Sequence, residues 1–352
     1  MPIVSIQCLE SGRVTRGRGM ISECEYEMSL DERWEYPRQN LRIGKILGEG
    51  EFGQVFQAQA TNISGRENEI VIVAVKMLKD DHNDTDMMDL VSEMEIMKLL
   101  GNHPNILRLI GCCSQRGPLY VITEYAQNGN LKNFLRKYLN EQSIKPSETT
   151  LISYAHQIAQ GMDYLASLKC IHRDLAARNI LVTADYTMKI ADFGLARNIR
   201  NTEYYKKTSD GRLPIKWMAP EALFHNKYTT QSDVWSFGIL LWEIVTLGGN
   251  PYPSINNFAG LHHALSQNYR MEKPPKTSTA VYDLMLDCWK YEPEHRPNFS
   301  TIVKRLTELL KNYEVVDQSM DAENPDEFES KSAISTTESS DVENEDEKHL
   351  LE

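Results

Sequence analysis

In one segment of the chain, charged and amide side chains are concentrated between short apolar runs. The sequence His172-Arg173-Asp174 is followed by Asn179 and, beyond two apolar runs, by Asp192-Phe193-Gly194. Those runs, residues 180–182 and 188–191, have the length and composition of short strands beside a polar loop. Because unpaired charge is costly to bury, carboxylates placed between buried strands indicate a chemical function. The pattern predicts one half of a phosphoryl-transfer site, although Asp-Phe-Gly alone occurs in many ordinary loops.

A glycine-rich turn lies between two predicted strands nearer the start of the chain. Leu41, Ile43 and Leu47 alternate with polar residues as in a half-buried strand, and residues 54–60 are the expected antiparallel partner. Glycines in the turn, residues 48–53, leave room for backbone N–H groups to approach phosphate oxygens closely. A hairpin turn without a ligand explains the same pattern. A dinucleotide-binding fold is disfavoured, because a strand and not a helix follows the turn.

The next predicted strand contains a lysine among apolar neighbours. Residues 70–78 are largely β-branched and include Lys76. This lysine either pairs with a carboxylate or extends its amine to solvent at the end of the strand. The helix predicted over residues 86–100 offers Glu93 and Glu95 as partners.

The remaining pattern predicts an α+β fold with a β-rich first lobe, which has one helix, and a mainly helical second lobe. Apolar strands at residues 106–110 and 119–123 complete the first lobe, and an amphipathic helix at residues 150–168 belongs to the second. We expect a flexible lead at residues 1–39, a first lobe at 40–123, a hinge at 124–129, a second lobe at 130–315 and an acidic disordered tail at 316–352. Within the lead, Trp34–Arg38 has a composition that could dock on the following domain.

Charge is distributed unevenly along the chain. The formal net charge is −12, and residues 317–352 carry thirteen Asp and Glu against two Lys, so eleven of the twelve negative charges lie there. This tail also has few large apolar residues, which predicts disorder. The rest of the chain is nearly neutral and lacks the clustered Lys and Arg that bind a nucleic-acid backbone, so no nucleic-acid partner is expected.

Cysteine usage and hydropathy indicate the cellular compartment in which the chain is expected. The six cysteines show no metal-ligand spacing, and a chain of this size does not need disulfides, which indicates a reducing compartment. No secretory signal is found at the start of the chain. The most apolar run, residues 234–247, is too short to cross a bilayer, which takes ~20 residues. We expect a cytoplasmic chain that reaches a membrane only through a missing or separate segment.

Five motifs occur in the order of the protein-kinase signature set, which this chain therefore resembles over roughly residues 41–313. They are the glycine-rich turn, Val73-Ala74-Val75-Lys76, His172-Arg173-Asp174 with Asn179, Asp192-Phe193-Gly194, and Ala219-Pro220-Glu221. The resemblance implies the bilobal kinase fold. More narrowly, Trp34–Arg38, the glycine-rich turn, Tyr204-Tyr205-Lys206-Lys207 and Ser232–Gly238 resemble receptor tyrosine kinases of the fibroblast growth factor receptor and Ret branch, which makes the lead juxtamembrane-like.

The resemblance implies ATP and Mg²⁺ as cofactors. Lys76, paired with Glu93 in preference to Glu95, would hold the phosphates, and Asn179 and Asp192 would bind Mg²⁺. The residues expected to contact ATP are Leu47, Gly48, Gly50, Gly53, Val55, Ala74, Lys76, Thr123, Glu124, Ala126 and Asn130. Those expected to act in catalysis are Asp174, which would orient the substrate hydroxyl and accept its proton, with Lys76, Glu93, Arg178 and Asn179. His172 is expected to pack and to bond backbone groups.

Within this resemblance, Ala176-Ala177-Arg178 favours tyrosine as the acceptor, because serine/threonine kinases usually carry a lysine two residues after the catalytic Asp. Proteins with tyrosine are therefore the expected substrates. Two alternatives remain: a serine/threonine kinase, and a catalytically silent ATP-binding scaffold (a pseudokinase). The intact Lys76, Asp174, Asn179 and Asp192 count against the scaffold.

The resemblance also implies regulation. Tyr204 and Tyr205 lie between the last two motifs, where phosphorylation would add charge that Arg173 and Arg197 can pair with. Activation would then occur by phosphorylation between two copies in a transient homodimer. The chain is expected to be a cytosolic kinase or the cytoplasmic part of a plasma-membrane receptor.

Two further expectations concern single positions. Glu221 and Arg296 should form a structural ion pair in the second lobe. Asn198 and Arg108 replace the Asp and the small amide usual in these receptors, which puts inherited autoinhibition in doubt.

Overall fold

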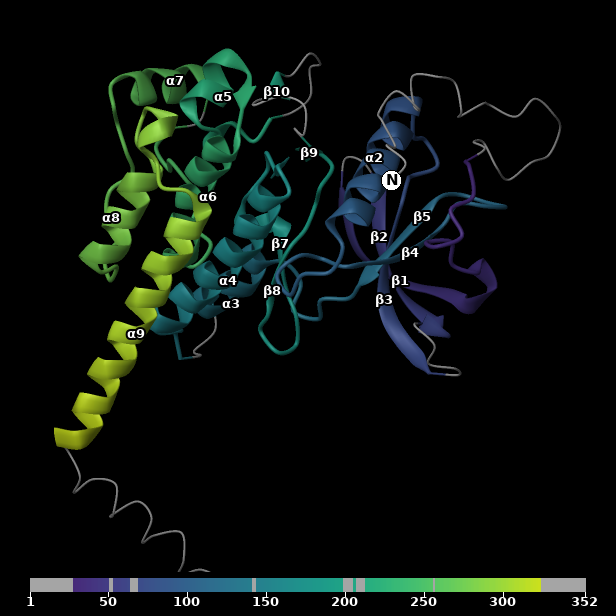
Figure 1. Cartoon of the computed structure of the whole chain (residues 1–352), viewed down its shortest axis with the longest axis horizontal. Coiled ribbons are helices and arrows are strands. Elements are labelled where there is room, and N and C mark those ends of the chain that lie inside the picture. Colours follow the sequence, from purple (N-terminus) through teal and green to yellow (C-terminus); the bar gives the residue numbers. More distant parts are fainter. Residues whose placement is uncertain are drawn as a thin grey trace, which may run out of the picture. The chain divides into compact units, whose positions relative to one another are not determined.

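The computed structural model describes residues 28–50, 53–63, 69–140, 144–198, 205–206, 213–255 and 257–323. The chain divides into one unit that ends at Leu306 and a second that begins at Thr307. The predicted first lobe and residues 130–306 of the predicted second lobe belong to the first unit, and the α+β fold class is confirmed (Figure 1).

A five-stranded sheet forms the first lobe, with the strand order β1-β2-β3-β5-β4 (Figure 1). All neighbouring strands are antiparallel. Because side chains alternate along a strand, Val73 and Val75 of β3 pack in an apolar core, whereas Ala74 and Lys76 face the other side of the sheet. The strands are β1 (Leu41–Gly50), β2 (Gly53–Thr61), β3 (Ile70–Met77), β4 (Leu109–Cys113) and β5 (Tyr120–Glu124).

Helix α2 (Asp84–Leu100) is the helix of the first lobe. Asn83 begins it with a capping box: its side chain accepts a hydrogen bond from the backbone N–H of Asp86, and the Asp86 carboxylate accepts from the N–H of Asn83. The buried face carries Leu90 and Met94 at helical spacing, and Glu93 is buried among them. A carboxylate is therefore placed in an apolar setting where it needs a cation.

Residues 28–40 pack along the outer edge of β4, and we call them the N-terminal strap. The backbone N–H of Tyr36 donates to the carbonyl of Cys112 at 2.7 Å, and the N–H of Cys112 donates to the carbonyl of Trp34 at 2.8 Å. The prediction of a flexible lead up to residue 39 is therefore wrong from Met28 onward, and the docking considered for Trp34–Arg38 is observed.

Side chains of the strap explain why it is ordered. The Glu35 carboxylate accepts hydrogen bonds from the Ser114 hydroxyl at 2.6 Å and from the Ser114 N–H at 3.1 Å. Arg38 ends the strap in a short 3₁₀ turn, η1 (Arg38–Asn40), and its Nη2 donates to the carbonyls of Cys113, Gln115 and Pro118. Charge-assisted bonds of this kind are among the stronger hydrogen bonds in proteins.

The second lobe is helical and is built around α6 (Thr230–Val245). Trp235 and Phe237 of α6 are fully buried, so the apolar run at residues 234–247 is a core helix as predicted. Among the residues that the structure describes, no helix is both long enough and apolar enough to cross a membrane. The other helices are α3 (Leu131–Asn140), α4 (Glu148–Ser167), α5 (Pro220–His225), α7 (Phe258–Ser266), α8 (Thr279–Cys288) and α9 (Phe299–Glu323).

Short strand pairs and 3₁₀ turns position the polar segments of the second lobe. The pairs are β6 (Cys170–Ile171) with β9 (Arg197–Asn198), β7 (Ile180–Val182) with β8 (Met188–Ile190), and β10 (Tyr205–Lys206) with β11 (Lys227–Tyr228). The turns are η3 (Ala177–Asn179), η4 (Ile215–Trp217) and η5 (Pro293–His295).

The predicted start of the disordered tail at residue 316 falls inside α9, which continues to Glu323. No Gly or Pro interrupts the sequence from Phe299 until Pro325, so nothing local ends the helix earlier. The boundary predicted from composition is therefore wrong, while the tail from residue 324 lies outside the described residues.

Candidate active site

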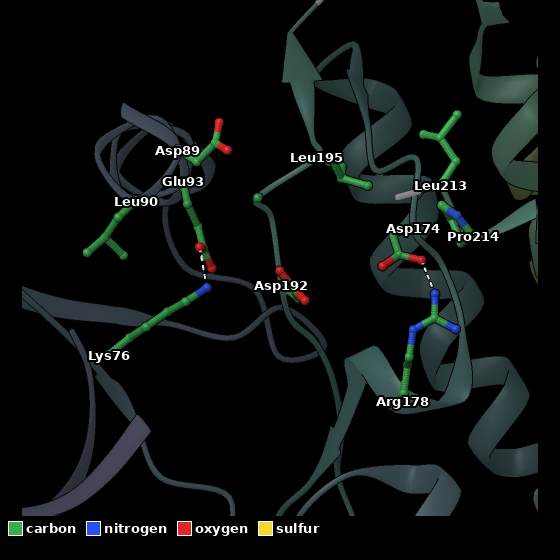
Figure 2. Close-up of a pocket in the computed structure, with 11 residues that line it drawn as sticks. Lys76, Asp89, Leu90, Glu93, Asp174, Arg178, Asp192, Leu195, Leu213 and Pro214 are labelled. Carbon is green, nitrogen blue, oxygen red and sulfur yellow. Dashed lines mark hydrogen bonds and ion pairs between the residues drawn. The ribbon is translucent and has the colours of Figure 1, made fainter. Parts of the chain in front are cut away.

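A lysine–glutamate pair joins the sheet to α2. Lys76 lies on the face of β3 away from the apolar core, and its Nζ is 2.5 Å from Oε2 of Glu93 (Figure 2). Burial disfavours the charged lysine, but the carboxylates of Glu93 and Asp192 outweigh it and raise the pKa of Lys76. Glu95 pairs with Lys98 at 2.8 Å, so the partner chosen for Lys76 in the sequence is the one observed.

The polar loop before β7 holds an aspartate in a fixed orientation. Asn179 donates through Nδ2 to the Asp174 carboxylate at 2.7 Å and to its backbone carbonyl at 2.8 Å. Arg178 forms an ion pair with the same carboxylate (Figure 2). Burial raises the pKa of Asp174 to about 6, against the lowering effect of Arg178 and of the Asn179 hydrogen bond. The group is therefore mostly ionised at neutral pH.

The β7–β8 hairpin brings Asn179 and Asp192 together. Ile180 pairs with Ile190 at the end of the hairpin, and the N–H of Ala191 donates to the carbonyl of Asn179 at 2.9 Å. Asp192 has a left-handed backbone with φ of +62°, which turns the chain directly after the strand. Figure 2 shows its carboxylate between the Lys76–Glu93 pair and Asp174.

These groups line one cavity. Residues of the first lobe form one wall, and the polar loops of the second lobe form the other (Figure 2). The cavity is lined by Lys76, Asp89, Leu90, Glu93, Asp174, Arg178, Asp192, Gly194, Leu195, Leu213 and Pro214. A pocket with four carboxylates, a lysine and an arginine suits a polyanion that arrives with a cation.

The positions predicted to contact ATP lie along the sheet and at its connection to the second lobe. Gly48 pairs with Val55 across β1 and β2, and Gly50 pairs with Gly53 at the end of the hairpin, whose residues 51 and 52 lie outside the described part. Leu47 is on β1, and Ala74 on β3 pairs with Thr123 on β5. The hairpin expected around the glycine-rich turn is thus present.

At the connection between the two lobes, the polar side chains form local hydrogen bonds and an ion pair. Glu124 accepts a bond from the N–H of Arg108 at 2.7 Å and pairs with Lys189 at 3.0 Å. Asn130 accepts a bond from the N–H of Asn133 at the start of α3, and Ala126 is buried. Of the eleven positions predicted to contact ATP, all of which the structure describes, Lys76 alone lines the cavity described above.

His172 packs inside the second lobe. It is fully buried, its Nε2 is 3.1 Å from the carbonyl of Ala191, and burial lowers its pKa to about 4. The ring is therefore neutral near pH 7, as the expected packing role requires.

The predicted regulatory arginines both contact the segment after Asp192-Phe193-Gly194. Arg173 donates through Nη1 to the carbonyl of Leu195 at 3.0 Å and lies 4.2 Å above the ring of Tyr228. Arg197 donates to the carbonyl of Ala196 at 2.6 Å. Tyr204 lies outside the described residues, and the backbone of Tyr205 pairs with Tyr228 as part of β10.

The family model for protein tyrosine and serine/threonine kinases matches residues 41–306, which include every group that lines the cavity. The chain belongs to this kinase family. The chain is 51% identical over 329 residues to fibroblast growth factor receptor homolog 1 of Drosophila melanogaster, covering 89% of the chain and 44% of that protein. It is 52% identical over 311 residues to fibroblast growth factor receptor 1 of Xenopus laevis, covering 84% of the chain and 38% of that receptor. The kinase chain thus spans less than half the length of these relatives.

A buried ion pair joins two distant parts of the kinase's second lobe. Arg296 donates to both oxygens of Glu221, at 2.7 and 2.8 Å, as the resemblance predicted. The remaining guanidinium hydrogens are taken by the carbonyls of Gln231, Lys290 and Tyr291.

The sequence did not reveal two acidic residues of α6 that hold the polar loop before β7, the segment that carries Asp174. The Asp233 carboxylate accepts bonds from the N–H groups of His172 at 2.8 Å and Arg173 at 3.0 Å. Glu243, which lies inside the apolar run at residues 234–247, accepts from the N–H of Ala177 at 2.9 Å. The available signal was an acid in a helix that is otherwise apolar, because a buried charge requires donors.

Proposed function

We propose that this chain is an active, ATP- and Mg²⁺-dependent protein tyrosine kinase of the receptor type, which transfers the γ-phosphoryl group of ATP to tyrosine hydroxyls. The observation that supports the proposal is the convergence of Lys76, Glu93, Asp174 and Asp192 on one cavity. A silent scaffold would not need this set, since ATP binding alone does not require an ionised, oriented Asp174.

The proposal assigns the phosphates to Lys76 and the metal to Asn179 and Asp192. These two side chains supply one amide and one carboxylate oxygen, and Mg²⁺ is bound by one or two such groups together with substrate phosphates. The chemistry of the donor set therefore fits magnesium brought in with ATP. When bound, Mg²⁺ neutralises charge that develops on the transferred group. Backbone groups of the glycine-rich turn and of residues 123–126, with Leu47, Val55, Ala74 and Asn130, would hold the rest of ATP.

Asp174 would orient the acceptor hydroxyl and take its proton. With a pKa of about 6, the carboxylate is mostly ionised at neutral pH and close enough to that pH to be a useful base. Arg178 and Asn179 fix its two oxygens in place. Because the transition state of phosphoryl transfer is loose, such positioning accounts for most of the rate enhancement expected.

Tyrosine is the proposed acceptor because of the residues beside Asp174. Ala176 stands where serine/threonine kinases usually carry a lysine, and the guanidinium of Arg178, two residues further on, lies 4.4 Å above the ring of Trp217 in η4. In this proposal residues 216–218 form the platform that holds the substrate backbone, and the contact joins this platform to the polar loop that carries Asp174. Both relatives described above carry the name of a receptor, which supports a role of this kinase in the cytoplasmic part of a plasma-membrane receptor.

Purified chain with ATP and Mg²⁺ should phosphorylate a peptide with a single tyrosine and not the same peptide with serine in its place. Removal of Mg²⁺ with a chelator should stop the transfer, and added Mg²⁺ should restore it. Equal transfer to serine would contradict tyrosine specificity, and no transfer to either peptide would support the scaffold alternative.

Regulation through Tyr204 and Tyr205 is part of the proposal. Replacing both with Phe should remove the increase in rate that follows preincubation with ATP, because no phosphate would be available to pair with Arg173 and Arg197. The measurement is peptide phosphorylation before and after preincubation, at two enzyme concentrations, since transfer within a transient homodimer accelerates with concentration. Tyr313, outside this segment, supplies the matched Phe control. Persistence of the rate increase in the double variant would refute this mechanism.

A further inference from the structure

A single buried carboxylate of the second lobe joins the turn η3, which follows Asp174, to the turn η4. Glu243 lies on α6 and is fully buried. Its Oε2 accepts hydrogen bonds from the backbone N–H of Ala177 at 2.9 Å and from the indole Nε1–H of Trp217 at 2.8 Å. The other oxygen, Oε1, has no hydrogen-bond partner among the residues that the structure describes. Both bonds therefore depend on the same oxygen atom.

The two donors belong to segments that contact each other through Arg178. Ala177 precedes Arg178 in η3, and Trp217 presents its ring to the Arg178 guanidinium at 4.4 Å. Arg178 in turn forms the ion pair with Asp174. Glu243, the η3 turn and Trp217 therefore contact one another in a closed arrangement. Glu243 bonds to both the turn and the indole ring, and the indole ring contacts Arg178 of the turn.

Other nearby side chains bond to Trp217 or place positive charge close to the Glu243 carboxylate. Ser236, two turns earlier on α6, donates through its hydroxyl to the Trp217 carbonyl at 2.7 Å. Lys132 at the start of α3 and Arg178 both lie near enough to act on Glu243 electrostatically. Burial raises the pKa of Glu243, and the two hydrogen bonds and these two cations oppose that effect.

We propose that Glu243 is a positioning residue for the acceptor tyrosine: it sets the placement of the Trp217 platform relative to Asp174 without contacting ATP. The inference rests on the proposed tyrosine kinase activity and assigns to α6 a part in it. Loss of the carboxylate should impair use of the peptide and leave ATP binding intact, because the hydrogen bonds of Glu243 go to Ala177 and Trp217 and not to Lys76, Glu93 or Asp192.

Steady-state kinetics on four variants of the whole chain test this. Glu243→Ala should lower kcat/KM for the tyrosine peptide about 100-fold, the loss that a misplacement of about 1 Å can cause, with less than about a twofold change in the KM for ATP. Glu243→Gln should recover most of that loss, because an amide oxygen at the position of Oε2 can accept both bonds. Trp217→Phe removes one donor and keeps a ring under Arg178, so its loss should be intermediate.

Trp242→Phe is the matched control. This neighbouring tryptophan donates its indole N–H to the carbonyl of Glu272 at the exposed side of α6, away from the catalytic loop. Its kinetics should equal those of the unaltered chain. If Glu243→Ala does not fold, Trp217→Phe and Glu243→Gln still decide the question, since each changes a single group.

A second readout does not depend on activity. The chain has five tryptophans, and the indole N–H signal of Trp217 is identified by its absence from the NMR spectrum of Trp217→Phe. In Glu243→Ala this signal should shift and exchange with solvent faster, while that of Trp242 stays unchanged. The proposal is overturned if the Trp217 signal is unaffected, or if ATP binding per folded molecule falls in parallel with peptide turnover. An unaltered chain that phosphorylates no tyrosine would refute the proposed function, and the indole signal would still report on the link to Glu243.

Discussion

Replacing Asp174 with Asn is expected to lower kcat for transfer to a tyrosine peptide by about 10²–10⁴-fold, the usual contribution of a positioned base. The amide keeps the size of the side chain and can still accept the bond from Asn179, but it cannot take a proton or pair with Arg178. Binding of ATP should change little, because Lys76 and Asp192 are intact. The measurement is single-turnover transfer at saturating ATP and Mg²⁺.

The pH dependence gives an independent check on the same residue. Since burial raises the pKa of Asp174 to about 6 and the base must be ionised, kcat/KM for the unaltered chain should rise with pH through about 6 and then level. The Asn variant should lack this rising limb. Activity that survives in the variant with the same pH profile would assign the base to another residue.

Breaking the Glu221–Arg296 pair is expected to cause the largest loss of stability. Glu221→Gln leaves the Arg296 guanidinium charged and buried, and loss of one partner of a buried pair costs about 3–5 kcal/mol. For a domain of this size that corresponds to a drop in Tm of roughly 6–10 °C. Thermal unfolding followed by circular dichroism measures it.

The chain offers a matched control for this variant. Arg305 and Asp287 form an ion pair at 2.6 Å, but about a third of each side chain is exposed. Arg305→Gln should therefore cost no more than about 1 kcal/mol. If the two variants unfold at the same temperature, burial does not make the Glu221–Arg296 pair special, and the prediction fails.

Local patterns were sufficient to predict the strands, the buried helix and the polar loops of this kinase. Alternation along β3 separates Lys76 from Val73 and Val75, and the antiparallel β7–β8 pair brings Asn179 beside Asp192. Each of these depends on neighbours within a few residues or on a simple hairpin. The choice of Glu93 over Glu95 came from the family resemblance. Both residues lie in α2, and periodicity alone did not decide which of them pairs with Lys76.

What the sequence could not predict depends on contacts between residues far apart along the chain. Asp233 contacts the backbone of His172, and Glu243 contacts Trp217, only because the fold brings α6 against both the polar loop before β7 and the turn η4. The sequence suggested docking of Trp34–Arg38 only from composition and did not predict its contacts, because Glu35 is an ordinary acidic residue until the fold brings Ser114 to it. No periodicity carries such information.

The strap also covers backbone hydrogen-bonding groups at the edge of the sheet. β4 is the last strand of the sheet, and an open last strand offers unsatisfied N–H and C=O groups to any other strand. Trp34 and Tyr36 occupy those of Cys112 from within the same chain. The region matched by the kinase family begins at residue 41, so a protein cut at that boundary would keep every residue that lines the cavity and would expose unpaired backbone groups of β4. The segment matched by the kinase family and the segment whose sheet edge is covered therefore begin at different residues.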